Sequence, residues 1–137
     1  SHDYAAAPNI GDRRMTPTTM GAGFTLANGA IVSEQLNAII EAAAEKAGIP
    51  YQASVVGRDT GTDGMAAFLA ARDAAATSIG FPIRNMHTPS ESGHTGDVLA
   101  AIHGIVATIQ AMDDAAMTRD DFRNGHARLD HAKPITS

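Results

Sequence analysis

Residues 33–64 read SEQLNAIIEAAAEKAGIPYQASVVGRDTGTDG, a helix pattern followed directly by a strand pattern. Ser33 is a preferred N-cap residue, and Gly48 suits the left-handed position at which many helices end. Residues 49–56 finish with β-branched side chains and predict a strand, and residues 57–64 predict a loop. The residues of the helix that recur at 3.6-residue spacing, and so predict its buried face, are Leu36, Ile39, Ile40, Ala43 and Ala47.

The same alternation continues along the chain. Residues 77–83 are a short apolar run, which predicts a buried strand, and residues 84–96 predict a second loop. One helix is expected from Gly64, capped by Asp63, and a longer one after the second loop, with Thr95 as its cap. The apolar face expected for the last helix consists of Val98, Ile102, Ile105, Ile109 and Met112. The order predicts an α/β fold with parallel strands, right-handed crossovers and helices on both faces.

The two ends of the chain differ from its middle. Glycine and proline punctuate the first thirty residues, where only residues 23–31 indicate extended structure. Beyond Thr118 the sequence is polar. We therefore assign residues 1–117 to the folded unit and expect residues 118–137 to form a flexible tail.

Composition excludes several classes of function. The formal net charge of −5 argues against a nucleic-acid partner, which normally selects a basic patch. No apolar run approaches the ~20 residues that cross a bilayer, so we expect no membrane partner. The chain has no cysteine, so a zinc ion would need His, Asp or Glu ligands. We expect a cytoplasmic protein.

His87 is the candidate metal ligand of the second loop, because a neutral imidazole on a loop after a buried strand is a common zinc ligand. The alternative is a surface histidine without a role, and spacing alone favours it, since no partner lies nearby. His94 fits a loop position, and His103 falls off the apolar face of the last helix. If the strands are parallel, the two loops leave neighbouring strand ends and form one wall of a site.

The turn Gly61-Thr62-Asp63-Gly64 has two interpretations. It is explained fully as a tight turn with an aspartate helix cap. It also suits a substrate site, because glycines admit a ligand to the backbone and the N–H groups at a helix start bind carboxylates. The sequence has no phosphate loop, dinucleotide fingerprint or nucleophile elbow.

Residues 21–112 resemble the C-terminal portion of the glutamyl-aminopeptidase and tetrahedral-aminopeptidase family, which includes endoglucanase-like members and consists of di-zinc exopeptidases. The resemblance rests on three segments in the family's order and spacing. These are Gly48-Ile49-Pro50-Tyr51-Gln52, Gly61-Thr62-Asp63, and Met86-His87-Thr88-Pro89 with Glu91. It implies the C-terminal half of a three-layer α/β/α zinc-peptidase domain.

By this resemblance His87 matches the family's last zinc ligand, and Gly61, Thr62 and Asp63 border the substrate site. The family uses two zincs per active site, with cobalt or manganese as substitutes. Its other ligands and its general base belong to upstream segments. The resemblance thus implies peptide substrates, the upstream half of the same protein as a partner, a homo-oligomer, and a chain that is inactive by itself.

Two alternatives stay open. A related zinc amidohydrolase or deacetylase would use a similar histidine loop on another substrate. A non-catalytic assembly module would have lost its metals. The loop after Glu91 departs from the family pattern at Gly93, His94 and Gly96. The resemblance therefore does not predict the shape of this loop.

Overall fold

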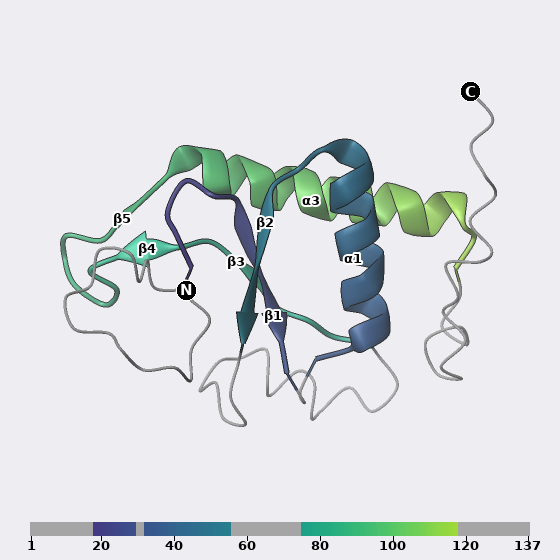
Figure 1. Ribbon diagram of the computed structural model, residues 1–137, viewed down its shortest axis with the longest axis horizontal. Helices are drawn as coiled ribbons and strands as arrows, with labels where there is room; N and C mark the ends of the chain where they lie inside the picture. Colours follow the sequence, from purple (N-terminus) through teal and green to yellow (C-terminus); the bar gives the residue numbers. More distant parts are fainter. Residues whose placement is uncertain (1–17, 30–31, 56–74, 118–137) are drawn as a thin grey trace.

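The structure, a computed structural model, describes residues 18–29, 32–55 and 75–117 (Figure 1). The helix expected from Gly64 and the tail expected over residues 118–137 lie outside these residues. The elements in chain order are β1 (Phe24–Asn28), α1 (Glu34–Ala47), β2 (Tyr51–Val55), β3 (Ile79–Gly80), β4 (Ile83–Arg84), β5 (Ser92–Gly93) and α3 (Thr95–Asp114).

β1 is the central strand of a three-stranded sheet with the order β2-β1-β3. It runs parallel to β2, in a register that pairs Phe24 with Tyr51 and Asn28 with Val55. Successive side chains of β1 point to opposite faces, and those of Phe24 to Ala27 are all buried. Burial on both faces is typical of a strand in a parallel sheet. The α/β fold class with parallel pairing and flanking helices is confirmed.

α1 begins and ends where the sequence predicts. The Ser33 hydroxyl accepts a hydrogen bond from the Leu36 N–H at 3.3 Å, and Gly48 takes a left-handed conformation with φ 66°. The face that it buries includes Ile39, Ile40, Ala43 and Ala44, together with one polar residue, Asn37.

Asn37 anchors α1 to the sheet. Its side-chain amide donates to the Ala27 carbonyl at 2.7 Å and to the Asn28 side-chain oxygen at 3.0 Å. Its own oxygen accepts from the Thr77 hydroxyl. Because Thr77 lies in the segment that enters β3, one buried side chain joins a helix, the end of β1 and the approach to the third strand.

Tyr51 of β2 packs its ring against that of Phe24, with centroids 5.8 Å apart. Its hydroxyl donates to the Glu45 carboxylate of α1 at 3.1 Å. Desolvation is the main cause that raises the pKa of Tyr51 above its usual value, and the hydrogen bond to Glu45 and the charges of Glu41 and Glu45 add to the effect. The phenol therefore stays protonated and serves as a donor between strand and helix.

The prediction of a single parallel strand over residues 77–83 is wrong in two respects. It is split into β3 and β4, because buried Pro82 between them has no N–H to offer a ladder. β3 also runs antiparallel to β1, pairing Ile79 with Leu26 and Gly80 with Thr25. β2 therefore ends beside Asn28 while β3 ends beside Thr25, at the opposite end of the sheet. The second loop begins after β4, in a separate two-stranded sheet, and the first loop lies outside the described residues.

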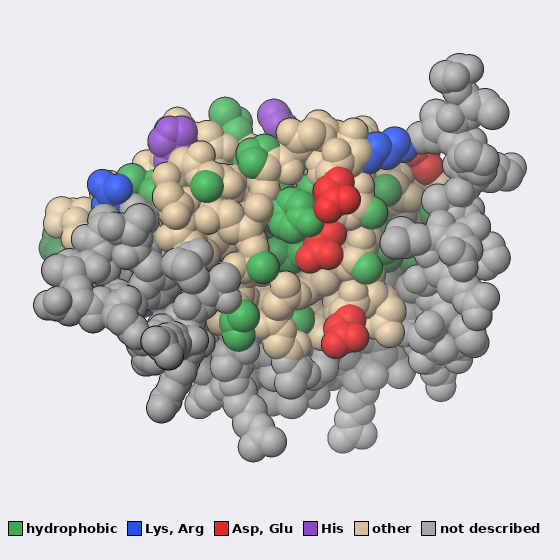
Figure 2. Space-filling view, viewed as in Figure 1, with side chains coloured by type: hydrophobic (Ala, Val, Ile, Leu, Met, Phe, Trp, Pro, Cys, Tyr) green, Lys and Arg blue, Asp and Glu red, His purple; other side chains and the backbone are tan. Residues whose placement is uncertain are grey.

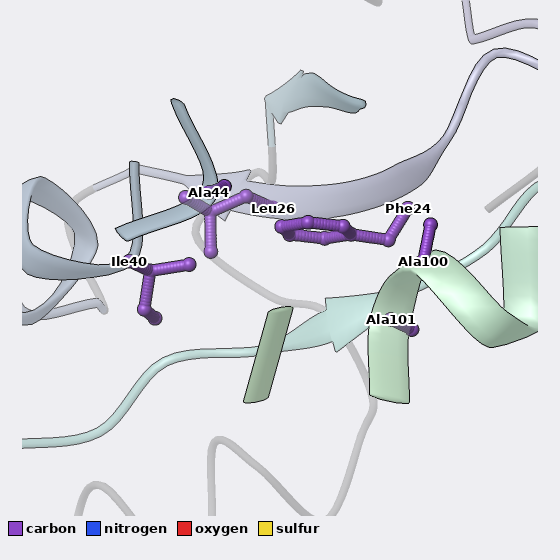
Figure 3. Close-up of a cluster of buried hydrophobic side chains, with 6 residues drawn as sticks. All are labelled: Phe24, Leu26, Ile40, Ala44, Ala100 and Ala101. Atoms are coloured by element: carbon purple, nitrogen blue, oxygen red, sulfur yellow. The ribbon is translucent and has the colours of Figure 1, made fainter. Parts of the chain in front are cut away.

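The face that α3 buries also differs from the prediction. α3 packs against α1 and β1 through small or polar residues, which are Asp97, Ala100, Ala101, Gly104 and Thr108. Figure 3 shows Phe24 and Leu26 of β1 in the core between Ile40 and Ala44 of α1 and the two alanines of α3. Small residues let the helix axis approach the sheet closely, so the larger side chains turn away from this contact.

The large apolar side chains of α3 form an exposed stripe, which we call the α3 stripe. Their exposed fractions are 54% for Leu99, 50% for Ile102, 43% for Ile105, 47% for Val106 and 61% for Ile109. At 20 residues, α3 is long and apolar enough to cross a membrane by length and composition, contrary to the expectation from the sequence. Its contacts with α1 and β1 are those of a helix within a folded domain.

The start of α3 is tied to the loop before β1 by the buried carboxylate of Asp97. One carboxylate oxygen accepts from the Gly21 N–H at 2.7 Å, and the other accepts from the Gly23 N–H at 2.8 Å. Gly23 has a φ of 102°, and a Cβ placed there would lie 2.1 Å from the Pro50 carbonyl oxygen. Only glycine fits this position, so the chain is clamped at a fixed point before it enters β1.

Replacing Asp97 with alanine should destabilise the chain, because it leaves the buried Gly23 N–H without its acceptor. We expect a loss of about 1–3 kcal/mol in the free energy of unfolding, measured by urea denaturation. Asp113→Ala, at an exposed position of the same helix, is the control and should be nearly neutral. Equal stability of the two variants would contradict the role of Asp97.

Filling the space at Gly104 should also destabilise the fold. A Cβ at Gly104 would lie 2.9 Å from Cε1 of Phe24. Gly104→Leu is expected to lower the free energy of unfolding by about 1–3 kcal/mol through overpacking, although leucine favours a helix by about 1 kcal/mol over glycine. Gln110→Leu, on the exposed side, should be neutral or slightly stabilising. A stabilised Gly104→Leu variant would show that α3 does not approach β1 this closely.

Candidate functional site

His87 lies at the tip of a small hairpin. β4 and β5 pair antiparallel, with Ile83 opposite Gly93 and Arg84 opposite Ser92, and the loop between them contains residues 85–91. In Figure 1 the hairpin lies near the start of α3, at the opposite side of the structure from α1. The histidine loop that the sequence predicts is therefore present, and a strand ladder fixes both of its ends.

The loop is held by its own polar groups. The Asn85 carbonyl accepts from the N–H and the hydroxyl of Thr88, at 3.1 and 2.7 Å. The Asn85 side chain donates to the Ser90 carbonyl at 3.3 Å, and the Ser90 N–H donates to the Thr88 hydroxyl at 3.3 Å. The N–H of His87 donates to the carboxylate of Glu91. The backbone on either side of the histidine is thus bonded within the loop.

Two residues of this loop have left-handed backbones, Asn85 with φ 54° and His87 with φ 64°. Asparagine and histidine adopt this region more often than most residues, but it is uncommon for any residue other than glycine. Such conformations persist where neighbouring interactions impose them, and they cluster at functional sites. The imidazole of His87 is exposed on the loop, so the constrained backbone presents a potential ligand to its surroundings.

The donor chemistry of His87 fits zinc, and an exposed ring can reach a metal. Among the described residues, however, no three His, Cys, Asp or Glu side chains converge. The part of the chain that the structure describes thus has no complete group of three side chains for a zinc ion, and His87 stays a predicted ligand. The predicted substrate-binding residues Gly61, Thr62 and Asp63 lie outside the described residues and stay predictions.

His94 has a structural role that the sequence analysis missed. It is the N-cap of α3, since its carbonyl accepts from the Asp97 N–H at 3.0 Å and its Nδ1 accepts from the Gly96 N–H at 3.1 Å. Thr95, the cap expected from sequence, is instead the first residue of the helix. Asp97 indicated this start of the helix, because acidic residues favour the first turn and Asp97 lies three positions after His94. His103 is exposed on α3, as predicted.

Charged and histidine side chains are separated on the surface. In the view of Figure 2, Asp and Glu side chains lie over α1, and histidines lie along the edge where α3 runs. The acidic residues of α1 are Glu34, Glu41 and Glu45. The hairpin with His87 lies away from this acidic helix, which therefore supplies no further metal ligand to it.

Several solved structures with this fold are described as aminopeptidases. PhTET1-12s, a dodecamer in the asymmetric unit, is 26% identical over 69% of this chain, with a TM-score of 0.58. An aminopeptidase from the archaeon Desulfurococcus kamchatkensis is 23% identical over 88% of the chain, with a TM-score of 0.68. A TET aminopeptidase from a marine-sediment Thaumarchaeota archaeon is 24% identical over 77%, with a TM-score of 0.66.

The family profile described as M42 glutamyl aminopeptidase matches residues 3–103. The chain belongs to this family, which confirms the resemblance seen in its sequence. It spans only 29%, 33% and 30% of the lengths of the three solved chains above. No curated protein gives a significant match.

Substitutions of His94 and His87 should differ in their effect on stability. His94→Ala removes the acceptor that caps α3 and should lower the free energy of unfolding by about 0.5–1 kcal/mol. His87→Ala removes an exposed ring and should stay within about 0.5 kcal/mol of the parent chain. Urea denaturation of the two variants checks this, and a greater loss for His87→Ala would show that the ring of His87 is structural.

Proposed function

We propose that the chain is part of a zinc-dependent aminopeptidase that removes N-terminal residues from peptides. Membership of the M42 family carries the proposal, and the placement of His87 supports it. Loops presented by a rigid scaffold commonly carry function. The histidine expected to bind metal lies on such a loop, constrained by a ladder and by local hydrogen bonds.

In this proposal His87 contributes one imidazole to a metal centre of two zincs, or of cobalt or manganese. When bound, such ions polarise the scissile carbonyl and lower the pKa of a water molecule. The neutral ring would bind through one nitrogen, and its other nitrogen would need an acceptor to fix the tautomer. Gly61, Thr62 and Asp63 are proposed to border the substrate.

The remaining ligands and the general base are proposed to come from further polypeptide of the same protein. The solved aminopeptidases carry about two thirds of their length beyond the part matched by this chain. The α3 stripe supports the same view. Its large side chains lie beside a polar edge formed by His103, Gln110 and Asp114, which already gives the helix a solvent-facing side. Apolar area of this extent commonly marks an interface.

A homo-oligomer is part of the proposal, since PhTET1-12s is described as a dodecamer. The cytoplasmic location and the absence of membrane and nucleic-acid partners stay predictions. A non-catalytic assembly module is the second candidate, and the specific observation in its favour is that no three metal-binding side chains converge among the described residues. A related zinc amidohydrolase is separated from a peptidase only by its substrates.

The chain by itself should not turn over peptides, because one protein ligand cannot hold two catalytic zincs. We expect no hydrolysis of amino-acid p-nitroanilides by the purified 137-residue chain with added Zn²⁺ or Co²⁺. A longer protein that contains these residues should be active, and His87→Ala should abolish its activity and its full metal content. His103→Ala, on the exposed side of α3, is the matched control and should retain both.

Two results would contradict the proposal. Turnover by the isolated chain at the level of an ordinary aminopeptidase would show that the essential ligands do not lie upstream. A longer protein with His87→Ala that keeps both metals and normal turnover would show that His87 is no ligand. A longer protein that folds but neither binds metal nor cleaves peptides would favour the assembly module.

A further inference from the structure

We propose that Glu91 is a positioning residue for His87. It holds the backbone of His87 so that the imidazole points in a fixed direction, and it does not itself contact a metal or a substrate. This inference rests on the proposed function, because it concerns the presentation of a metal ligand. It is carried by the hydrogen bond from the His87 N–H to the Glu91 carboxylate and by the left-handed backbone of His87.

Glu91 is itself placed by the strand ladder. It directly precedes β5, where Ser92 pairs with Arg84 of β4. The carboxylate therefore starts from a fixed point and reaches back four residues to the His87 N–H. Since its acceptor atom is anchored at the ladder, the hydrogen bond fixes the tip of the loop relative to the strands.

The consequence for the imidazole follows from backbone geometry. A change in φ rotates the N–H and the Cα–Cβ bond of a residue relative to each other, and His87 has a φ of 64° that most residues avoid. Release of the N–H would let His87 return to the common regions with negative φ. The ring would then point in a different direction. The hydrogen bond from the His87 N–H to Glu91 therefore keeps the imidazole of His87 pointing in one direction.

A carboxylate next to a histidine has two other interpretations. Glu91 could be a metal ligand together with His87, or it could be a solvated charge that only favours a cation nearby. Both of these roles require the negative charge, whereas an acceptor for a backbone N–H requires only an oxygen. Glu91→Gln keeps an oxygen and removes the charge, so it separates positioning from both alternatives.

The test uses the whole chain labelled with ¹⁵N. Native-state amide exchange of His87 is measured on this chain for the parent, Glu91→Ala, Glu91→Gln and Ser90→Ala. Zinc affinity of the same four variants is measured by competition with a chelator on a longer protein that contains these residues. Ser90→Ala is the matched control, because it removes an exposed side chain of the same loop that does not bond the His87 N–H.

We expect Glu91→Ala to speed exchange of the His87 amide about threefold to tenfold, the factor equivalent to one net hydrogen bond. In the longer protein the same variant should weaken zinc affinity about threefold. Glu91→Gln and Ser90→Ala should match the parent in both measurements. If Glu91 acted as a metal ligand or only through its charge, Glu91→Gln would not behave like the parent.

Unchanged amide exchange in Glu91→Ala would overturn the proposal, and so would a Glu91→Gln variant as weak in zinc binding as Glu91→Ala. Failure of the proposed function would look different. In that case a longer protein with His87→Ala would keep its metals and its turnover, while amide exchange of His87 would still decide whether Glu91 holds the loop.

Discussion

The buried carboxylate of Asp97 is the interaction on which the arrangement of the described elements depends. A buried charge is tolerated only when hydrogen bonds replace its water, and here the N–H groups of Gly21 and Gly23 do so. The contact joins the first turn of α3 to a loop more than seventy residues earlier in the chain. It therefore fixes the entry of β1 relative to α3, and with it the end of the hairpin that presents His87.

Close packing of α3 follows from the same contact. Once the first turn is clamped beside the start of β1, only small residues fit between the helix and the strand. Gly104 leaves room for the ring of Phe24, and Ala100 and Ala101 complete the contact. The large side chains of the α3 stripe are left exposed, which supports the proposal that further polypeptide of the aminopeptidase covers them.

Several interactions within the hairpin hold the backbone that carries the His87 side chain. Ladder pairs hold its base, local hydrogen bonds hold its loop, and a left-handed backbone holds His87 at the tip. Among the described residues, neither α1 nor α3 brings enough metal-binding side chains to this tip to complete a group of three. This geometry agrees with a chain that spans about a third of its solved relatives.

The sequence by itself determined the elements whose causes are local. Ser33 and Gly48 mark the two ends of α1, and β2 follows directly after Gly48 as the strand pattern predicts. The motif around His87 indicated the family. These signals act within a few residues. Only the tertiary structure decided what depends on distant contacts. The antiparallel course of β3 is set by its pairing with Thr25 and Leu26, and the buried side of α3 is set by Asp97 and the space beside Phe24. Periodicity identifies which residues of a helix are apolar, but it cannot tell which of two apolar sides meets the sheet, since that choice depends on residues far away in the chain.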